Sequence, residues 1–181
     1  MKKPFRLYLT SFFALALAVT AFPTAQAKAP QDLPEQAQAP QAHRAVCDRS
    51  QDSETANCHA KVIVDKNGSP QAATAPSGYG PAQFRTAYGL TNLNSTATIA
   101  IVDAYNHPNI KSDLDIYNTQ FGLPFFPTCT TVTQTSCFQK VDQNGGTAYP
   151  ATNAGWALEI ALDVEVAHGI CPTCKILLVE A

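Results

Sequence analysis

Two carboxylates one helical turn apart, Glu159 and Asp163, stand in a stretch of otherwise apolar sequence. At about 100° per residue around a helix axis, Asp163 lies about 40° from Glu159. Their stripe also carries Trp156, Val166 and Ile170, at about 60°, −20° and 20°. Glu165 and His168 fall on the opposite side, where we expect the face of the helix that meets solvent. The spacing therefore predicts that the two acids point inward beside the tryptophan.

Such a pair suggests acid/base chemistry. Like charges at this spacing disfavour a helix by roughly a few tenths of a kcal/mol, and an unpaired carboxylate is far more costly to bury. Two acids relieve both costs by sharing one proton, which raises the pKa of one group and keeps the other low. A pair of this kind is suited to general acid/base catalysis at acidic pH. A solvated polar face is the alternative, because most Glu-x-x-x-Asp pairs are exposed.

Asp103 could add a third carboxylate to this pair. It ends the apolar run of residues 96–105, whose continuous hydrophobicity predicts a central strand covered on both faces. The carboxyl end of such a strand is where open α/β sheets bind their ligands. A strand-end aspartate that caps a turn with Asn106 is the alternative interpretation.

The elements that must position these acids alternate between strand and helix. We expect helices over residues 81–90, 109–121 and about 153–168, and further strands at 137–142 and 175–181. Asn153 is expected to cap the last helix, and Gly169 with Pro172 to end it. This alternation predicts an α/β fold with a parallel sheet and helices on both faces. A sheet of about three strands is too narrow to close a core, so we expect the front half of a larger domain.

The N-terminal part of the chain has a different character. Lys2, Lys3 and Arg6 precede an apolar run and an Ala-x-Ala site at residues 25–27, which predicts a secretory signal peptide over residues 1–27. Residues 28–75, rich in Pro, Gln, Ala and later Gly and Ser, predict a disordered linker followed by an arm on the domain surface. Residues 76–181 are then the folded domain.

The charge and hydropathy of the sequence argue against two kinds of partner, nucleic acid and membrane. Without residues 1–27, nine basic residues face 14 acidic ones, a net charge of −5, and no basic run is present. This balance argues against a nucleic-acid partner, and no later segment approaches the length of a membrane span. We therefore expect a secreted or periplasmic protein with no membrane contact after signal cleavage.

Six cysteines form three close pairs, and no metal site is expected. An even number in an exported chain predicts disulfides. Fifteen pairings are possible, and we expect the local one: Cys47 with Cys58, Cys129 with Cys137, and Cys171 with Cys174. The last pair follows a helix and precedes a strand, the reverse of a thioredoxin-like site. The four histidines lack zinc-ligand spacing, and His107 is expected in a solvated loop.

Several sequence blocks, in order, resemble the sedolisin (serine-carboxyl) peptidases, and most closely a bacterial secreted branch. The blocks cover roughly residues 76–181 and read IAIVDAYNHPN, LDIYNTQFGLP, CFQKV with QNGGT, GWALEIALDVEVAH and CPTCKILLVEA. The resemblance implies a subtilisin-like, doubly wound α/β fold with only its N-terminal half present, and acid-active endopeptidase chemistry on proteins or peptides. It implies Glu159 as general base, Asp163 as the group that orients it, and Asp103 as an auxiliary acid.

The chain departs from that family at the nucleophile. The family attacks with a serine in a Gly-Thr-Ser motif, and every serine after residue 27 precedes the helix and lacks that motif. The family's oxyanion aspartate and calcium-binding segment also lie beyond the blocks matched here, so we expect no cofactor in these residues. The resemblance therefore implies a truncated peptidase, inactive alone. A non-catalytic secreted binding module that keeps a peptidase half-fold is the alternative.

Overall fold

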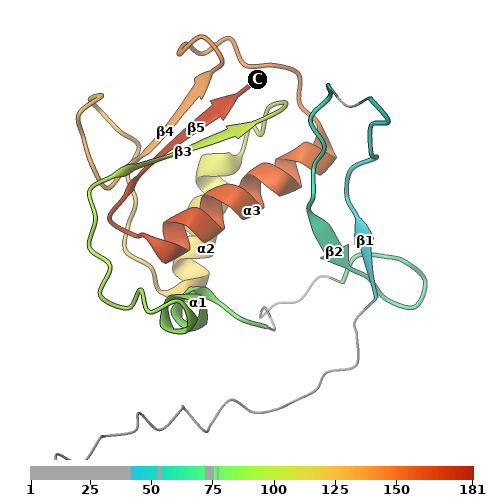
Figure 1. The fold of residues 1–181 in the computed structure, drawn as a ribbon, viewed down its shortest axis with the longest axis horizontal. Helices are drawn as coiled ribbons and strands as arrows, with labels where there is room; N and C mark the ends of the chain where they lie inside the picture. The colour runs from blue at the N-terminus through green and yellow to red at the C-terminus, as the bar shows by residue number, and fades with distance from the viewer. Residues whose placement is uncertain (1–41, 53, 72–75, 77) are drawn as a thin grey trace, which may run out of the picture. The chain divides into compact units, whose positions relative to one another are not determined.

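The computed structural model describes residues 42–52, 54–71, 76 and 78–181. The predicted signal peptide and the first part of the predicted linker lie outside these residues. The described part contains a two-stranded antiparallel hairpin, a three-stranded parallel sheet and three helices (Figure 1).

The parallel sheet confirms the α/β class. Its strand order is β3 (Thr98–Asp103), β5 (Lys175–Glu180), β4 (Phe138–Asp142), with β5 in the centre. In the observed register, Glu180 of β5 pairs with Asp103 on one side and with Asp142 on the other. The carboxyl end of the sheet therefore carries a row of three acidic residues.

The prediction that the first of these strands is central is wrong. β3 lies at the edge of the sheet, and its side chains alternate: Ile99 and Ile101 pack against the hydrophobic core, whereas Val102 is 68% exposed. The run of apolar residues was misleading because β-branched side chains also favour exposed strand positions, so composition alone does not distinguish one covered face from two.

Two helices cover one face of the sheet. α2 (Ile110–Phe121) and α3 (Ala154–Ile170) lie on the same side, and the short α1 (Pro81–Ala87) packs against α3 (Figure 1). The core between helices and sheet consists of Ile110, Leu114, Phe126, Phe138, Ile160, Val164, Ile176 and Leu178. The prediction of helices on both faces is wrong for the part of the chain that the structure describes.

The N-terminus of α3 lies where the sequence predicts it, but the C-terminus does not. The Asn153 side chain accepts hydrogen bonds from the backbone N–H groups of Gly155 and Trp156, as expected of an N-cap. Gly169 does not stop the helix, which continues to Ile170. A methyl group on Gly169 would lie 3.0 Å from Pro81, so the glycine permits close approach of α1.

The solvent-facing side of α3 also differs from the prediction. His168 is fully buried, with its ring 4.0 Å from that of Phe126, and Glu165 is half-buried. α1 and α2 both pack against α3, which accounts for this burial of the face expected to meet water. The exposed stripe instead carries Leu158, Leu162 and Val166, which are 43%, 48% and 36% exposed. The prediction that Val166 points inward with the two acids is therefore wrong.

Residues 42–71 form an arm that reaches the first half of α3. Its two short strands, β1 (His43–Ala45) and β2 (Lys61–Ile63), pair in antiparallel fashion (Figure 1). The Cys47–Cys58 disulfide closes the loop between them.

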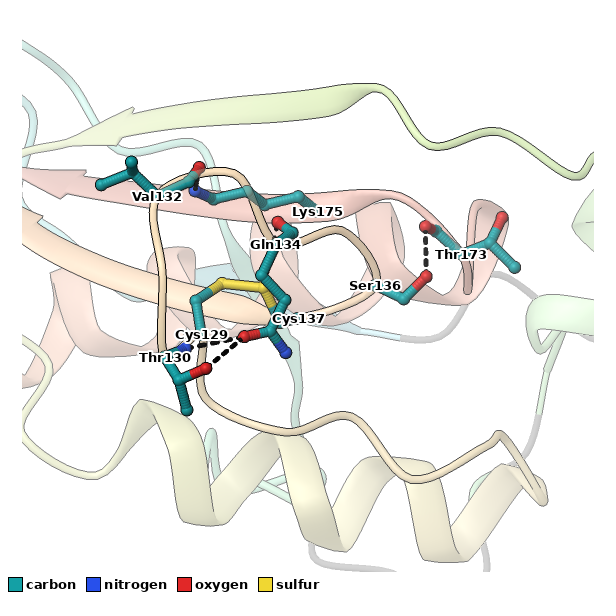
Figure 2. Close-up of a disulfide and its surroundings, with 8 residues drawn as sticks. All are labelled: Cys129, Thr130, Val132, Gln134, Ser136, Cys137, Thr173 and Lys175. Carbon is teal, nitrogen blue, oxygen red and sulfur yellow. Dashed lines mark hydrogen bonds between the residues drawn. A yellow bond between two sulfur atoms is a disulfide. The ribbon is translucent and has the colours of Figure 1, made fainter.

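All three predicted disulfides are confirmed. Figure 2 shows the loop closed by Cys129 and Cys137, where the Gln134 side chain accepts hydrogen bonds from the backbone N–H and hydroxyl of Thr130. The Lys175 ammonium donates to a backbone carbonyl of this loop at 3.0 Å. The loop thus ties the start of β4 to the start of β5, at the end of the sheet opposite the acidic row.

Candidate functional site

The three acids at the carboxyl end of the sheet have different surroundings. The Asp142 carboxylate accepts backbone hydrogen bonds from Asn144, Gly146 and Ala148, and these bonds lower its pKa. Glu180 is fully buried and forms an ion pair with Lys140 at 2.9 Å. Each of these two acids therefore has partners that account for its place in the fold.

Asp103 lacks such compensation. It is 8% exposed, and its Oδ2 is buried without a hydrogen-bond partner among the described residues. Burial, followed by the negative charges of Asp163, Glu159 and Glu180, raises the pKa of Asp103 from 3.8 to about 6. These contributions place the two helix acids within electrostatic reach of the tip of β3.

The helix acids differ from each other in exposure and hydrogen bonding. Glu159 is 9% exposed, and its Oε1 accepts a hydrogen bond from the backbone N–H of His59 at 3.0 Å. Its Oε2 is buried and has no hydrogen-bond partner in the part of the chain that the structure describes. Asp163 is half-buried, and burial, then the charge of Glu159, raises its pKa. No hydrogen bond joins the two carboxylates within the described residues, so the shared proton stays a prediction.

Aromatic side chains border the acids. Trp156 is 9% exposed, as its place on the inward stripe predicts, and its ring lies 6.2 Å from that of Tyr105. Tyr105 adopts a left-handed backbone conformation with φ of 65°, two residues after Asp103. Such a conformation is costly for a bulky residue, so the turn that follows the candidate acid is held in a strained form.

A network of charged and polar groups around Lys140, not predicted from the sequence, fixes this turn. The Lys140 ammonium donates to the Asn106 side-chain oxygen at 2.6 Å and to the His107 carbonyl at 2.9 Å, in addition to its ion pair with Glu180. Glu180 accepts from the His107 backbone N–H at 2.8 Å. Charged residues inside otherwise apolar strands were the available signal, because such residues are buried only when paired.

The prediction that His107 lies in a solvated loop is wrong. The side chain is 7% exposed, and its Nε2 lies 3.0 Å from the Asp113 carboxylate. Burial lowers the pKa of His107, although the nearby aspartate opposes this effect. The network of Lys140 and Glu180 holds its backbone against the sheet, which explains the burial. The alternative of an Asp103 turn cap is also unsupported, because the hydrogen-bond partner of the Asn106 side chain is Lys140.

Asp103 interacts electrostatically with Glu159 and Asp163. The serines that the structure describes are Ser50, Ser69, Ser95, Ser112 and Ser136, and none of them forms a hydrogen bond to these acids. Within the same residues, no group of three or more His, Cys, Asp or Glu side chains is arranged to hold a metal ion. None of the described helices is long and apolar enough to cross a membrane.

Comparisons of this chain with models of protein families, with curated proteins and with solved structures found no match. The chemistry of the site is therefore inferred from its own residues. The site consists of one carboxylate on β3 and two on α3, all partly removed from water. Because the pKa values of Asp103 and Asp163 are raised, the site can bind and release protons in mildly acidic solution.

Proposed function

We propose that Glu159, Asp163 and Asp103 form the acid/base part of a secreted peptidase site of the sedolisin, serine-carboxyl type, on a subtilisin-like α/β fold. The observation that carries the proposal is the burial of Asp103 and Glu159, each with one carboxylate oxygen that has no hydrogen-bond partner among the described residues. Burial, and after it the charges of Asp163 and Glu159, raises the pKa of Asp103 to about 6. The ordered sequence blocks that resemble this family supply the reaction class. Three disulfides agree with an exported protein.

In this proposal, Glu159 is the general base. Its Oε1 is occupied by the His59 N–H, so Oε2 is the oxygen that receives a proton from an attacking hydroxyl. Asp163 stands one turn further along α3, where it orients Glu159 and shares its proton. Asp103, the auxiliary acid, is protonated below its pKa of about 6 and negatively charged above it. The substrate is a protein or peptide, and the nucleophilic serine comes from outside the described residues.

The proposal is tested in the protein expressed from its complete reading frame. We expect cleavage of casein or denatured haemoglobin between pH 3 and 5, and a loss of about 10² to 10⁴-fold in kcat/KM for Glu159→Gln. The matched control is Glu165→Gln on the same helix. Burial raises the pKa of Glu165 to about 7, so glutamine resembles the neutral acid present at the assay pH.

Robust turnover that survives Glu159→Gln would exclude the proposed role. A reading frame without a Gly-Thr-Ser serine, and a product without peptidase activity, would instead favour the non-catalytic binding module.

A further inference from the structure

The arm of residues 42–71 contacts the candidate site through its backbone. The backbone N–H of His59 donates to Glu159 Oε1 at 3.0 Å, across a separation of 100 residues in the chain. It is the one hydrogen bond to this carboxylate within the described residues. The carboxylate thus depends on the arm for its orientation.

The arm is built to deliver this N–H group. Cys58 and Ala60, on either side of His59, are 6% and 3% exposed, whereas the His59 side chain points to solvent. The Cys47–Cys58 disulfide holds the preceding residue, and the Val46 N–H donates to the Ala60 carbonyl at 3.2 Å. The polar backbone of residue 59 therefore faces α3 while its side chain faces away.

A second contact holds the arm one helical turn before Glu159. A methyl group on Gly155 would lie 2.7 Å from the Val46 carbonyl oxygen and 2.9 Å from the Cys47 sulfur, both far inside normal contact distance. Glycine at this position therefore lets the arm approach the first turn of α3. The two contacts together fix where the arm lies along the helix.

We propose that the disulfide-closed arm is a positioning element for Glu159, and that the backbone N–H of His59 is its positioning group. This inference rests on the proposed function of Glu159. The hydrogen bond fixes Oε1 and leaves Oε2 directed at the reacting group. The acids that interact electrostatically with Glu159 are Asp163 from α3 and Asp103 from β3, so the N–H dipole also opposes the repulsion among these acids when they are ionised.

The test observes the hydrogen bond itself. In the ¹⁵N-labelled full chain, the His59 amide should exchange slowly with solvent, because its N–H is hydrogen-bonded to Glu159. Glu159→Ala removes the acceptor and should speed this exchange about tenfold. Fast exchange of the His59 amide in the wild-type chain, or an equal rate in Glu159→Ala, would overturn the inference.

A matched pair of variants tests the positioning role. His59→Ala keeps the N–H and removes only an exposed side chain, whereas His59→Pro removes the N–H. In the protein from the complete reading frame, we expect kcat of His59→Pro to be about tenfold below that of His59→Ala, with KM similar, as loss of one charge-assisted hydrogen bond implies. Equal kcat values would contradict positioning.

One outcome separates this inference from the proposed function. Absence of peptidase activity in every form, including wild type, would defeat the proposed function, and the exchange rate of the His59 amide would still decide whether the contact exists. Should His59→Pro prevent folding, detected as loss of the wild-type amide dispersion, Gly155→Ala provides the second perturbation. Displacement of the arm by the added methyl should then lower kcat with little change in KM.

Discussion

Replacement of Asp103 by asparagine should change how folding stability depends on pH. The folded-state pKa of Asp103 is raised from 3.8 to about 6, so the folded protein binds this proton more tightly than the unfolded chain does. Stability from this group is therefore fully present below pH 3.8 and is lost as pH rises through 6. A shift of this size corresponds to about 3 kcal/mol between the two limits.

Urea unfolding of wild type and Asp103→Asn, measured at intervals from pH 3.5 to 7.5, isolates this contribution because other groups titrate in both proteins. As pH rises across this range, the unfolding free energy of the variant should increase by about 3 kcal/mol relative to that of wild type. Asp142→Asn is the matched control on the next-but-one strand. Backbone hydrogen bonds lower the pKa of Asp142, so that variant should lose stability relative to wild type as pH rises.

If the difference in unfolding free energy between wild type and Asp103→Asn does not change with pH, the reasoning is refuted. It would mean that the Asp103 carboxyl meets water in the folded protein, away from the helix acids. The difference in unfolding free energy must also change mainly between pH 4 and 6, because that is the interval between the unfolded and folded pKa values of Asp103.

Three further predictions concern buried or closely packed groups. Burial lowers the pKa of His168 from 6.5 to about 4, so its stabilising contribution is lost as pH falls through this range, and His168→Leu should reduce acid destabilisation in urea unfolding by up to about 3 kcal/mol. Lys140→Met leaves Glu180 buried and unpaired, which should cost roughly 3–5 kcal/mol in the same assay, and a second change, Glu180→Met, should recover most of it. Gly155→Ala should speed amide hydrogen exchange in the arm while exchange in β5 is unchanged, because the added methyl displaces only the arm.

Local patterns in the sequence predicted much of the fold. The Asn153 cap, the three cysteine pairs and the α/β alternation were all readable, because each depends on residues close together in the chain. The inward stripe of α3 was also predictable where it carries Trp156 and Glu159, since helical periodicity determines which residues share a face.

The errors concern the order and packing of elements. Strand composition did not distinguish the edge strand β3 from the central β5, because pairing partners come from distant segments. His168 was assigned to solvent, since its side of α3 is covered only once α1 and α2 are in place. The His59 contact had no sequence signature at all, because a backbone N–H is the same for every residue except proline.

The central claim is that Asp103 on β3 and the two acids on α3 interact as one electrostatic cluster. Its most direct test is the ¹³C titration of the Asp103 side-chain carboxyl in wild type, Asp163→Asn and Glu159→Gln. We predict a midpoint near pH 6 in wild type and a lower midpoint in both variants, with the larger decrease in Asp163→Asn. A wild-type midpoint near 3.8, or one that neither variant changes, would contradict the claim.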